Sequence, residues 1–213
     1  MPFLSALRLS RLVGFLGFAA LLVGTGVWPL SLHAQSSPDA SHYVRVGGGL
    51  SDYTGDSGGD RGIADFFDAQ KFNEGPFPFV ITAEAGFRFS SATSAGLGYQ
   101  GGQYPRANAS ETALGTDRHT LYAWGRHHFG PPSWLVTPYL DAGLNLTMGG
   151  DAVGTGPSVG GGMTVTVAPR VSVYLESRLH VTFGDAAVDG VGPNGVPFDV
   201  LSALPATGVR IDI

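Results

Sequence analysis

The side chains best suited to chemistry lie on alternate positions of one stretch, VSVYLESRLHVTF, which runs from Val171 to Phe183. Glu176, Arg178 and His180 follow one another at a spacing of two residues. In a β-strand this spacing puts a carboxylate, a guanidinium and an imidazole on one face, while the opposite face is almost wholly apolar. Such groups could transfer protons in a catalytic site, or they could neutralise one another in a polar interior.

The catalytic interpretation needs a nucleophile, an imidazole and an acid within reach of one another. His119 is expected near the end of its strand, where the neighbouring strands offer no Asp or Glu beside it. His127 and His128 adjoin a turn and have no further metal ligands nearby. We therefore expect a protein without enzymatic activity, cofactor or metal, and a lipid-modifying enzyme is the least favoured alternative.

The strand that carries these groups is unusually long for a soluble protein. It has thirteen residues, whereas strands of soluble proteins usually have about 5–6. A tilted strand of this length can cross the hydrocarbon layer of a membrane. The stretch therefore predicts one strand of a membrane barrel, apolar outside and polar inside.

The N-terminus has the layout of a secretory signal peptide. Arg8 and Arg11 precede an apolar run, and Leu32-His33-Ala34 forms a small-residue cleavage site. The sequence thus predicts a cleaved signal peptide over residues 1–34 and a short periplasmic lead-in over 35–41. A barrel would then occupy residues 42–213. A retained membrane anchor is the alternative for the leader.

Charge and cysteine content exclude other classes. The chain has a formal net charge of −5, and removing the leader takes away two arginines and no acids. An acidic chain lacks the basic face that nucleic acids require, so no nucleic-acid partner is expected. No cysteine is present, so the exported protein must be stabilised by hydrogen bonds and packing.

Alternating stretches recur along the chain, at residues 42–52, 77–89, 93–103, 117–129, 135–148, 157–168, 171–183 and 198–213. The connections between them alternate in length: 53–76, 104–116, 149–155 and 184–197 are longer, and 90–92, 130–133 and 169–170 are short. This asymmetry is typical of outer-membrane barrels, which have long external loops and short periplasmic turns. A soluble lipocalin-like barrel, with its apolar face inward, is the alternative.

Ten charged residues fall on the polar faces of these stretches and should share the lumen: Arg45, Glu84, Arg88, Arg118, Arg126, Asp141, Glu176, Arg178, Arg210 and Asp212. An eight-stranded barrel has room only for side chains, so these charges are expected to form a neutralising plug. A narrow gated pathway for ions or small solutes is the alternative. Glu176 and Arg178 should lie too far apart along the strand for a direct pair, and Arg210 is the expected partner of Glu176.

The connection 53–76 is the strongest candidate for binding another molecule. It combines acidic and aromatic residues, and loops on a rigid scaffold often carry function. An adhesin-like surface contact would use Asp56, Asp60, Asp65, Phe66, Phe67, Asp68 and Phe72. A solvated loop joined to lipopolysaccharide by divalent cations is the alternative, and the sequence does not separate the two.

Two segments resemble a known family. RHHFGPPSWLVTPYLDAGLNL at residues 126–146, which includes Pro138-Tyr139-Leu140-Asp141-Ala142-Gly143-Leu144, is similar to a strand–turn–strand unit of small outer-membrane barrels. The opening Tyr43-Val44-Arg45-Val46-Gly47-Gly48-Gly49 is similar to their first strand. The resemblance is to the OmpA membrane domain, OmpW and opacity-protein type, although members of this group typically end in an aromatic residue, whereas this chain ends in Ile213.

The resemblance implies an all-β, eight-stranded antiparallel up-and-down transmembrane β-barrel in the outer membrane of a Gram-negative-type bacterium. It also implies contact with outer-membrane lipid and lipopolysaccharide, and insertion by the barrel-assembly machinery. The expected function is that of an integral outer-membrane protein, structural or weakly permeable.

Overall fold

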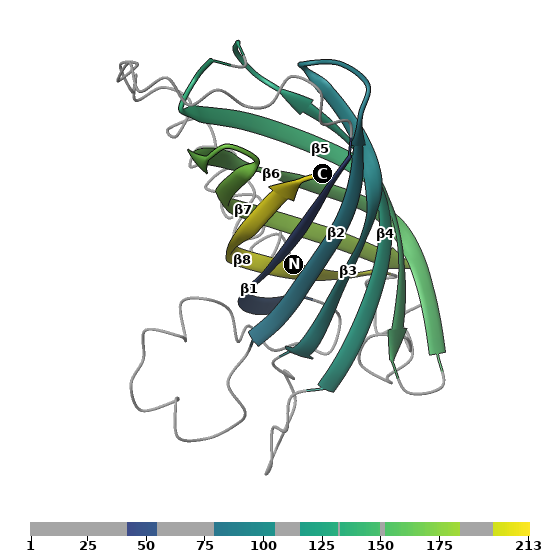
Figure 1. The fold of residues 1–213 in the computed structure, drawn as a ribbon. Coiled ribbons are helices and arrows are strands. Elements are labelled where there is room, and N and C mark those ends of the chain that lie inside the picture. Colours follow the sequence, from purple (N-terminus) through teal and green to yellow (C-terminus); the bar gives the residue numbers. More distant parts are fainter. Residues whose placement is uncertain (1–41, 55–78, 105–115, 132, 150–151, 184–197) are drawn as a thin grey trace, which may run out of the picture. The chain divides into compact units, whose positions relative to one another are not determined.

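The computed structural model describes residues 42–54, 79–104, 116–131, 133–149, 152–183 and 198–213 (Figure 1). The predicted signal peptide, the lead-in and the binding candidates of the segment 53–76 lie outside the described residues. No helix within the described ranges is long and apolar enough to cross a membrane.

Eight antiparallel strands form one closed barrel in which each strand pairs with its neighbours in sequence and the last pairs with the first (Figure 1). They are β1 (His42–Thr54), β2 (Phe79–Arg88), β3 (Thr93–Tyr104), β4 (Thr116–His128), β5 (Val136–Gly149), β6 (Ala152–Ala168), β7 (Val171–Phe183) and β8 (Phe198–Asp212). The predicted all-β, eight-stranded antiparallel barrel is confirmed. Closure leaves no unpaired sheet edge, which is what a sheet needs to span a membrane.

The two faces of the barrel are the reverse of those in a soluble barrel. Large apolar side chains are exposed on the outside, and Leu144 and Leu97 keep 69% and 68% of their surface accessible. Charged and polar side chains are buried inside, and Arg45, Arg126 and Arg178 are among the largest fully buried residues. The lipocalin-like alternative, with its apolar core inside, is therefore wrong.

Aromatic side chains mark both ends of the apolar exterior. Phe79 opens β2, and Phe183 lies 6.2 Å from Phe198 between ring centroids at the same end. At the other end Phe87 lies 5.0 Å from Phe89. A strand rising about 3.4 Å per residue and tilted by about 40° covers roughly 21 Å between Phe79 and Phe87 of β2, which is close to the height of about 25 Å that the apolar band has in membrane barrels.

One predicted loop is largely strand. Residues 149–155 were expected to connect two strands, but β6 begins at Ala152 and pairs with Gly149 at the end of β5. The glycines at 149, 154 and 156 suggest a loop because glycine is a poor strand former. Pairing with β5 on one side overrides that local preference.

Candidate functional site

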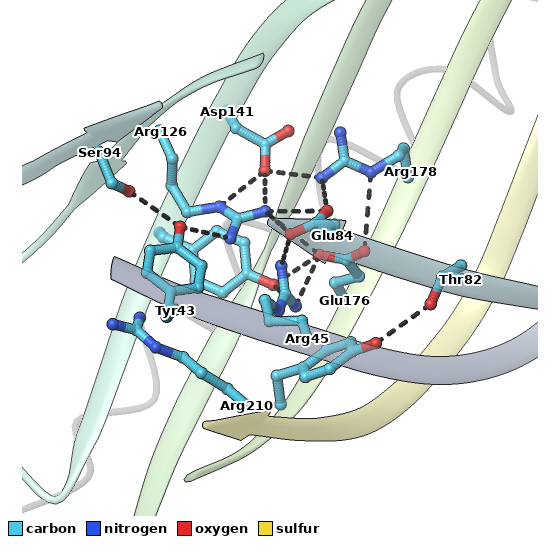
Figure 2. Close-up of polar contacts among 12 residues, drawn as sticks. Tyr43, Arg45, Thr82, Glu84, Ser94, Arg126, Asp141, Glu176, Arg178 and Arg210 are labelled. Atoms are coloured by element: carbon cyan, nitrogen blue, oxygen red, sulfur yellow. Dashed lines mark hydrogen bonds and ion pairs between the residues drawn. The ribbon is translucent and has the colours of Figure 1, made fainter. Parts of the chain in front are cut away.

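Six charged side chains from five strands meet inside the barrel, and we call them the central charge network (Figure 2). They are three guanidinium groups and three carboxylates, each nearly or fully buried: Arg45, Arg126, Arg178, Glu84, Asp141 and Glu176. Burying an isolated charge costs several kcal/mol, so equal numbers of each sign are required for such a cluster to be stable.

Glu84 lies at the centre of the network and contacts all three arginines. Its Oε2 is 2.7 Å from Arg45 Nη1 and 3.1 Å from Arg126 Nη2. Its Oε1 is 3.2 Å from Arg178 Nη2. The pairing register explains the first contact, because Arg45 and Glu84 are direct cross-strand partners between β1 and β2.

The other two carboxylates complete the network. Asp141 Oδ2 accepts from Arg126 Nη2 at 2.9 Å and from Arg178 Nη2 at 2.8 Å. Glu176 Oε2 accepts from Arg45 Nη2 at 3.0 Å and from the Tyr139 hydroxyl at 2.7 Å. Each carboxylate therefore serves two or more partners, and the six residues form one continuous polar unit.

Aromatic rings cover the guanidinium groups of the network. Arg45 Cζ lies 3.6 Å from the Tyr174 ring centroid, and Arg126 Cζ lies 4.3 Å from that of Trp124. Arg178 Cζ lies 4.6 Å from the Tyr122 ring, whose hydroxyl donates to Glu84 Oε1 at 3.0 Å. Stacking on a ring satisfies the guanidinium face that the carboxylates leave uncovered.

Glycines make room for these rings, which yields a test. A Cβ at Gly98 would collide with three atoms of the Tyr122 side chain, whereas a Cβ at Gly125, on the outer face of the next strand, would meet nothing within 4 Å. We expect Gly98→Ala to lower the unfolding free energy by about 1–3 kcal/mol through overpacking. Gly125→Ala should be close to neutral. Urea unfolding of both variants in lipid vesicles measures the difference, and equal effects would contradict a packed lumen.

The predicted pairing of Glu176 with Arg210 is wrong. Arg210 lies opposite Ser172 of β7 and binds Asp212, whereas Glu176 lies opposite Ala206. The expectation that Glu176 and Arg178 are too far apart is also wrong, because Glu176 Oε1 and Arg178 Nε are 3.6 Å apart. Both side chains are long and point toward the barrel axis, so their charged ends lie closer together than their backbone positions do.

The remaining four predicted charges lie outside the central network. Arg88, Arg210 and Asp212 gather at the end of the barrel where the short turns lie, with Arg210 Nη2 2.6 Å from Asp212 Oδ1. Arg118 lies near the other end of β4, where its Nη1 donates to the Asp117 carbonyl at 2.8 Å. The ten predicted residues thus divide into the central charge network, a group of three at the turn end, and Arg118 at the loop end.

Sequence reasoning missed the hydrogen-bonded aromatic partners and an uncharged polar layer toward the loop end. In that layer the Thr120 and Thr147 hydroxyls are 3.0 Å apart, and Asn145 Nδ2 donates to the Val181 carbonyl at 2.8 Å. Strand alternation places all of these residues inside, so the signal was present. The Thr120–Thr147 contact joins direct partners on consecutive strands. The Asn145–Val181 and Tyr122–Glu84 contacts could not be read from alternation, because each joins strands that are not adjacent in sequence.

Within the described residues, His119, His128 and His180 make side-chain hydrogen bonds with the hydroxyl groups of Tyr99, Ser94 and Ser158. His180 Nδ1 contacts Ser158 Oγ, but both side chains are fully or almost fully buried, so a substrate from solution has no access to them. On the outer face, His119 Nδ1 is 2.7 Å from the Tyr99 hydroxyl. Within the described ranges there is no group of three His, Cys, Asp or Glu residues that could hold a metal ion.

No protein-family model matches the chain, and no curated protein matches it. Among solved structures, the chain is similar to the N-terminal β-barrel domain of Pseudomonas aeruginosa OprF. That match has 12% identity and a TM-score of 0.43, and it covers 80% of this chain and 98% of the solved barrel domain.

Two further structures are similar. The outer membrane protein OprG from Pseudomonas aeruginosa matches with 11% identity and a TM-score of 0.44, over 82% of this chain and 96% of that one. Ail, the attachment invasion locus protein of Yersinia pestis, matches with 12% identity and a TM-score of 0.39, over 80% of this chain and 99% of the Ail chain. The chain resembles small eight-stranded outer-membrane barrels. At these identities the likeness concerns the fold.

Proposed function

We propose that the protein is an integral outer-membrane β-barrel with a closed lumen, and that it serves a structural role in the cell envelope. The observation that carries the proposal is the reversed barrel: an apolar exterior surrounds a buried network of three arginines and three carboxylates. In this proposal the chain is exported through its signal peptide, inserted by the barrel-assembly machinery and surrounded by lipid and lipopolysaccharide.

The density of contacts supports a closed lumen. Arg126 Nε and Nη2 both bind Asp141 Oδ2, at 3.0 and 2.9 Å, and Nη2 also reaches Glu84. An ion crossing the lumen would have to separate several buried charged contacts at once, each desolvated and therefore strong. A plug of this kind favours stability over conduction.

A narrow gated pore is the second candidate, and one feature favours it. Arg178 Nη1 and Asp141 Oδ1 are buried and have no hydrogen-bond partner within the described residues. Unused donors and acceptors in one network provide alternative pairings, so its side chains could exchange partners. The adhesin-like role of the segment 53–76 stays a proposal, and lipid-modifying activity is the least favoured.

Single-channel recording of the refolded protein in planar bilayers tests the closed lumen. We expect no current steps from the wild-type protein, because the central charge network fills the barrel axis. Proteoliposomes from the same preparation provide the control for insertion, since an inserted barrel resists added protease. Stepwise currents from inserted protein would replace the structural role with the gated pore.

A further inference from the structure

Three charged side chains meet inside the barrel at its turn end, and we call Arg88, Arg210 and Asp212 the turn-end group. Asp212 Oδ1 lies 2.6 Å from Arg210 Nη2 and 3.7 Å from Arg88 Nη2. Both guanidinium groups therefore approach the same carboxylate oxygen, one from β2 and the other from β8. Arg88 extends into the lumen, on the opposite face from its outward neighbours Phe87 and Phe89.

The two arginines of the turn-end group are satisfied to different extents. Arg210 donates to Asp212 Oδ1 from both Nε and Nη2, and its Cζ lies 3.9 Å from the centroid of the Tyr43 ring (Figure 2). Arg88 is too far from Asp212 for a hydrogen bond and makes no other polar contact within the described residues. Because 23% of its side chain is exposed, its N–H donors are available to a ligand that enters from the turn end.

A further N–H donor lies beside the turn-end group. Ser94 is the direct cross-strand partner of Arg88, and its Oγ is 3.2 Å from His128 Nε2. An arginine can only donate, so the Tyr43 hydroxyl accepts from Arg126 Nη1 and keeps its own proton for Ser94 Oγ (Figure 2). Ser94 then donates to His128 Nε2, which places the imidazole proton on Nδ1. This Nδ1 has no hydrogen-bond partner among the residues that the structure describes.

The turn-end group carries one more positive charge than negative, since two guanidinium groups share one carboxylate. The central charge network is balanced and has no carboxylate to spare for it. No other Asp or Glu lies near this end in the described part of the chain. Arg88 and Arg210 are also close enough to His128 for their charges to act on its ring. An anion at this mouth of the lumen therefore meets a positive potential.

We propose that Arg88 binds a small oxyanion of the phosphate class at the turn-end mouth of the lumen, with His128 Nδ1 as the second donor. A guanidinium group holds two oxygens of such an anion through parallel N–H···O contacts, which a monatomic anion cannot accept. The ligand comes from the aqueous phase, because both donors lie on the inner face of the wall and away from its apolar exterior. The inference goes beyond the structural role and does not depend on it, because the site needs only the folded barrel.

Titration of inorganic phosphate into the refolded protein in maltoside micelles tests the site. Sodium chloride keeps the ionic strength constant, and the pH is fixed. NMR spectra of the histidine rings give a readout for each residue, since His128 lies at the site and His119 lies toward the other end of β4. We expect saturable shifts of the His128 signals and unchanged His119 signals.

Variants at two arginines separate a site from a general attraction. Arg88→Gln should weaken phosphate binding about tenfold or more, because charged hydrogen bonds are lost. Arg88→Lys keeps the charge without the planar fork, so its affinity should fall between the two. The matched control is Arg170→Asn, which removes a positive charge from the β6–β7 turn at the same end and should change the affinity by less than about twofold. Arg170 has a φ of 69°, which asparagine tolerates better than most residues.

The variants should keep the barrel folded, because Arg88 is partly exposed and Asp212 retains both hydrogen bonds from Arg210. Heat-modifiable migration on gels shows that each variant is folded. If Arg88→Gln fails to fold, the wild type and Arg88→Lys decide the question.

Three outcomes would overturn the inference. The first is the absence of a saturable His128 shift in the wild type, or an affinity that Arg88→Gln and Arg88→Lys leave unchanged. The second is an equal loss in Arg88→Gln and Arg170→Asn, which would show a general attraction to positive charge. The third is loss of phosphate binding when phosphatidylglycerol is mixed into the micelles, which would assign the donors to a lipid headgroup. The structural role stands in each case, because the bilayer recordings test it separately.

Discussion

Replacing Glu84 with glutamine should cost the barrel about 3–5 kcal/mol of unfolding free energy, because it leaves the central charge network with one arginine too many. Glu84 touches Arg45, Arg126 and Arg178, so no single remaining carboxylate can take over its contacts. Glutamine keeps the size and one acceptor oxygen, so the loss reports charge and not volume. Urea unfolding in phospholipid vesicles, followed by tryptophan fluorescence, measures it.

The matched control removes one charge of each sign. Glu84→Gln combined with Arg45→Met leaves Arg126 and Arg178 with Asp141 and Glu176, a balanced set that is still in contact. We expect the double variant to be more stable than the Glu84→Gln single variant, since methionine fills much of the arginine volume without a buried charge. Simple addition of the two single losses would show that the pair is not coupled and would contradict the network as described.

The Glu84→Gln single variant also separates the structural role from the gated pore. A structural plug that loses Glu84 becomes less stable but stays packed, so planar bilayers should remain silent. A gate that loses Glu84 loses the group that holds three arginines together, and current should flow. Conductance from Glu84→Gln together with a silent wild type would favour the gated pore.

Strand alternation was enough to predict the faces of the barrel, and the reason is physical. Successive side chains of a strand point to opposite faces, so Arg45, Glu84 and Arg126 had to point away from the faces of their neighbours Val46, Ala85 and His127. No tertiary information is needed for that assignment. The alternation pattern therefore predicts which charged side chains share the lumen, but it does not predict which of them form ion pairs.

The partners could not be predicted because they depend on register and on irregularities in the wall. The pairing of β8 with β7 shifts between Glu176 and Arg178, where Ala206 and Ala203 are the opposite residues. The same part of β8 shifts against β1 between Gly49 and Ser51. Such a bulge changes the height of every later side chain relative to the neighbouring strands. Arg210 lies opposite Ser172, four residues from Glu176 along β7, whereas Glu176 reaches across the lumen to Arg45.

Replacing Leu144 with arginine should destabilise the protein by about 2–4 kcal/mol if the apolar exterior faces the middle of a bilayer. Leu144 lies well inside β5, is 69% exposed, and pairs with Ala123 and Pro157 on the neighbouring strands. On a soluble protein an exposed leucine can become arginine at almost no cost, because water solvates the charge. In hydrocarbon the same charge loses its hydration. Unfolding in lipid vesicles by urea reads out the difference.

The control places the same side chain at the edge of the apolar band. His127 is exposed at the turn end of β4, with its ring 4.9 Å from Phe129, and His127→Arg should cost only about 0–1 kcal/mol. The contrast between Leu144→Arg and His127→Arg therefore measures depth, since both variants add an arginine to the outer face. Equal small losses, together with wild-type protein that stays folded in buffer without lipid or detergent, would contradict the membrane position of the barrel.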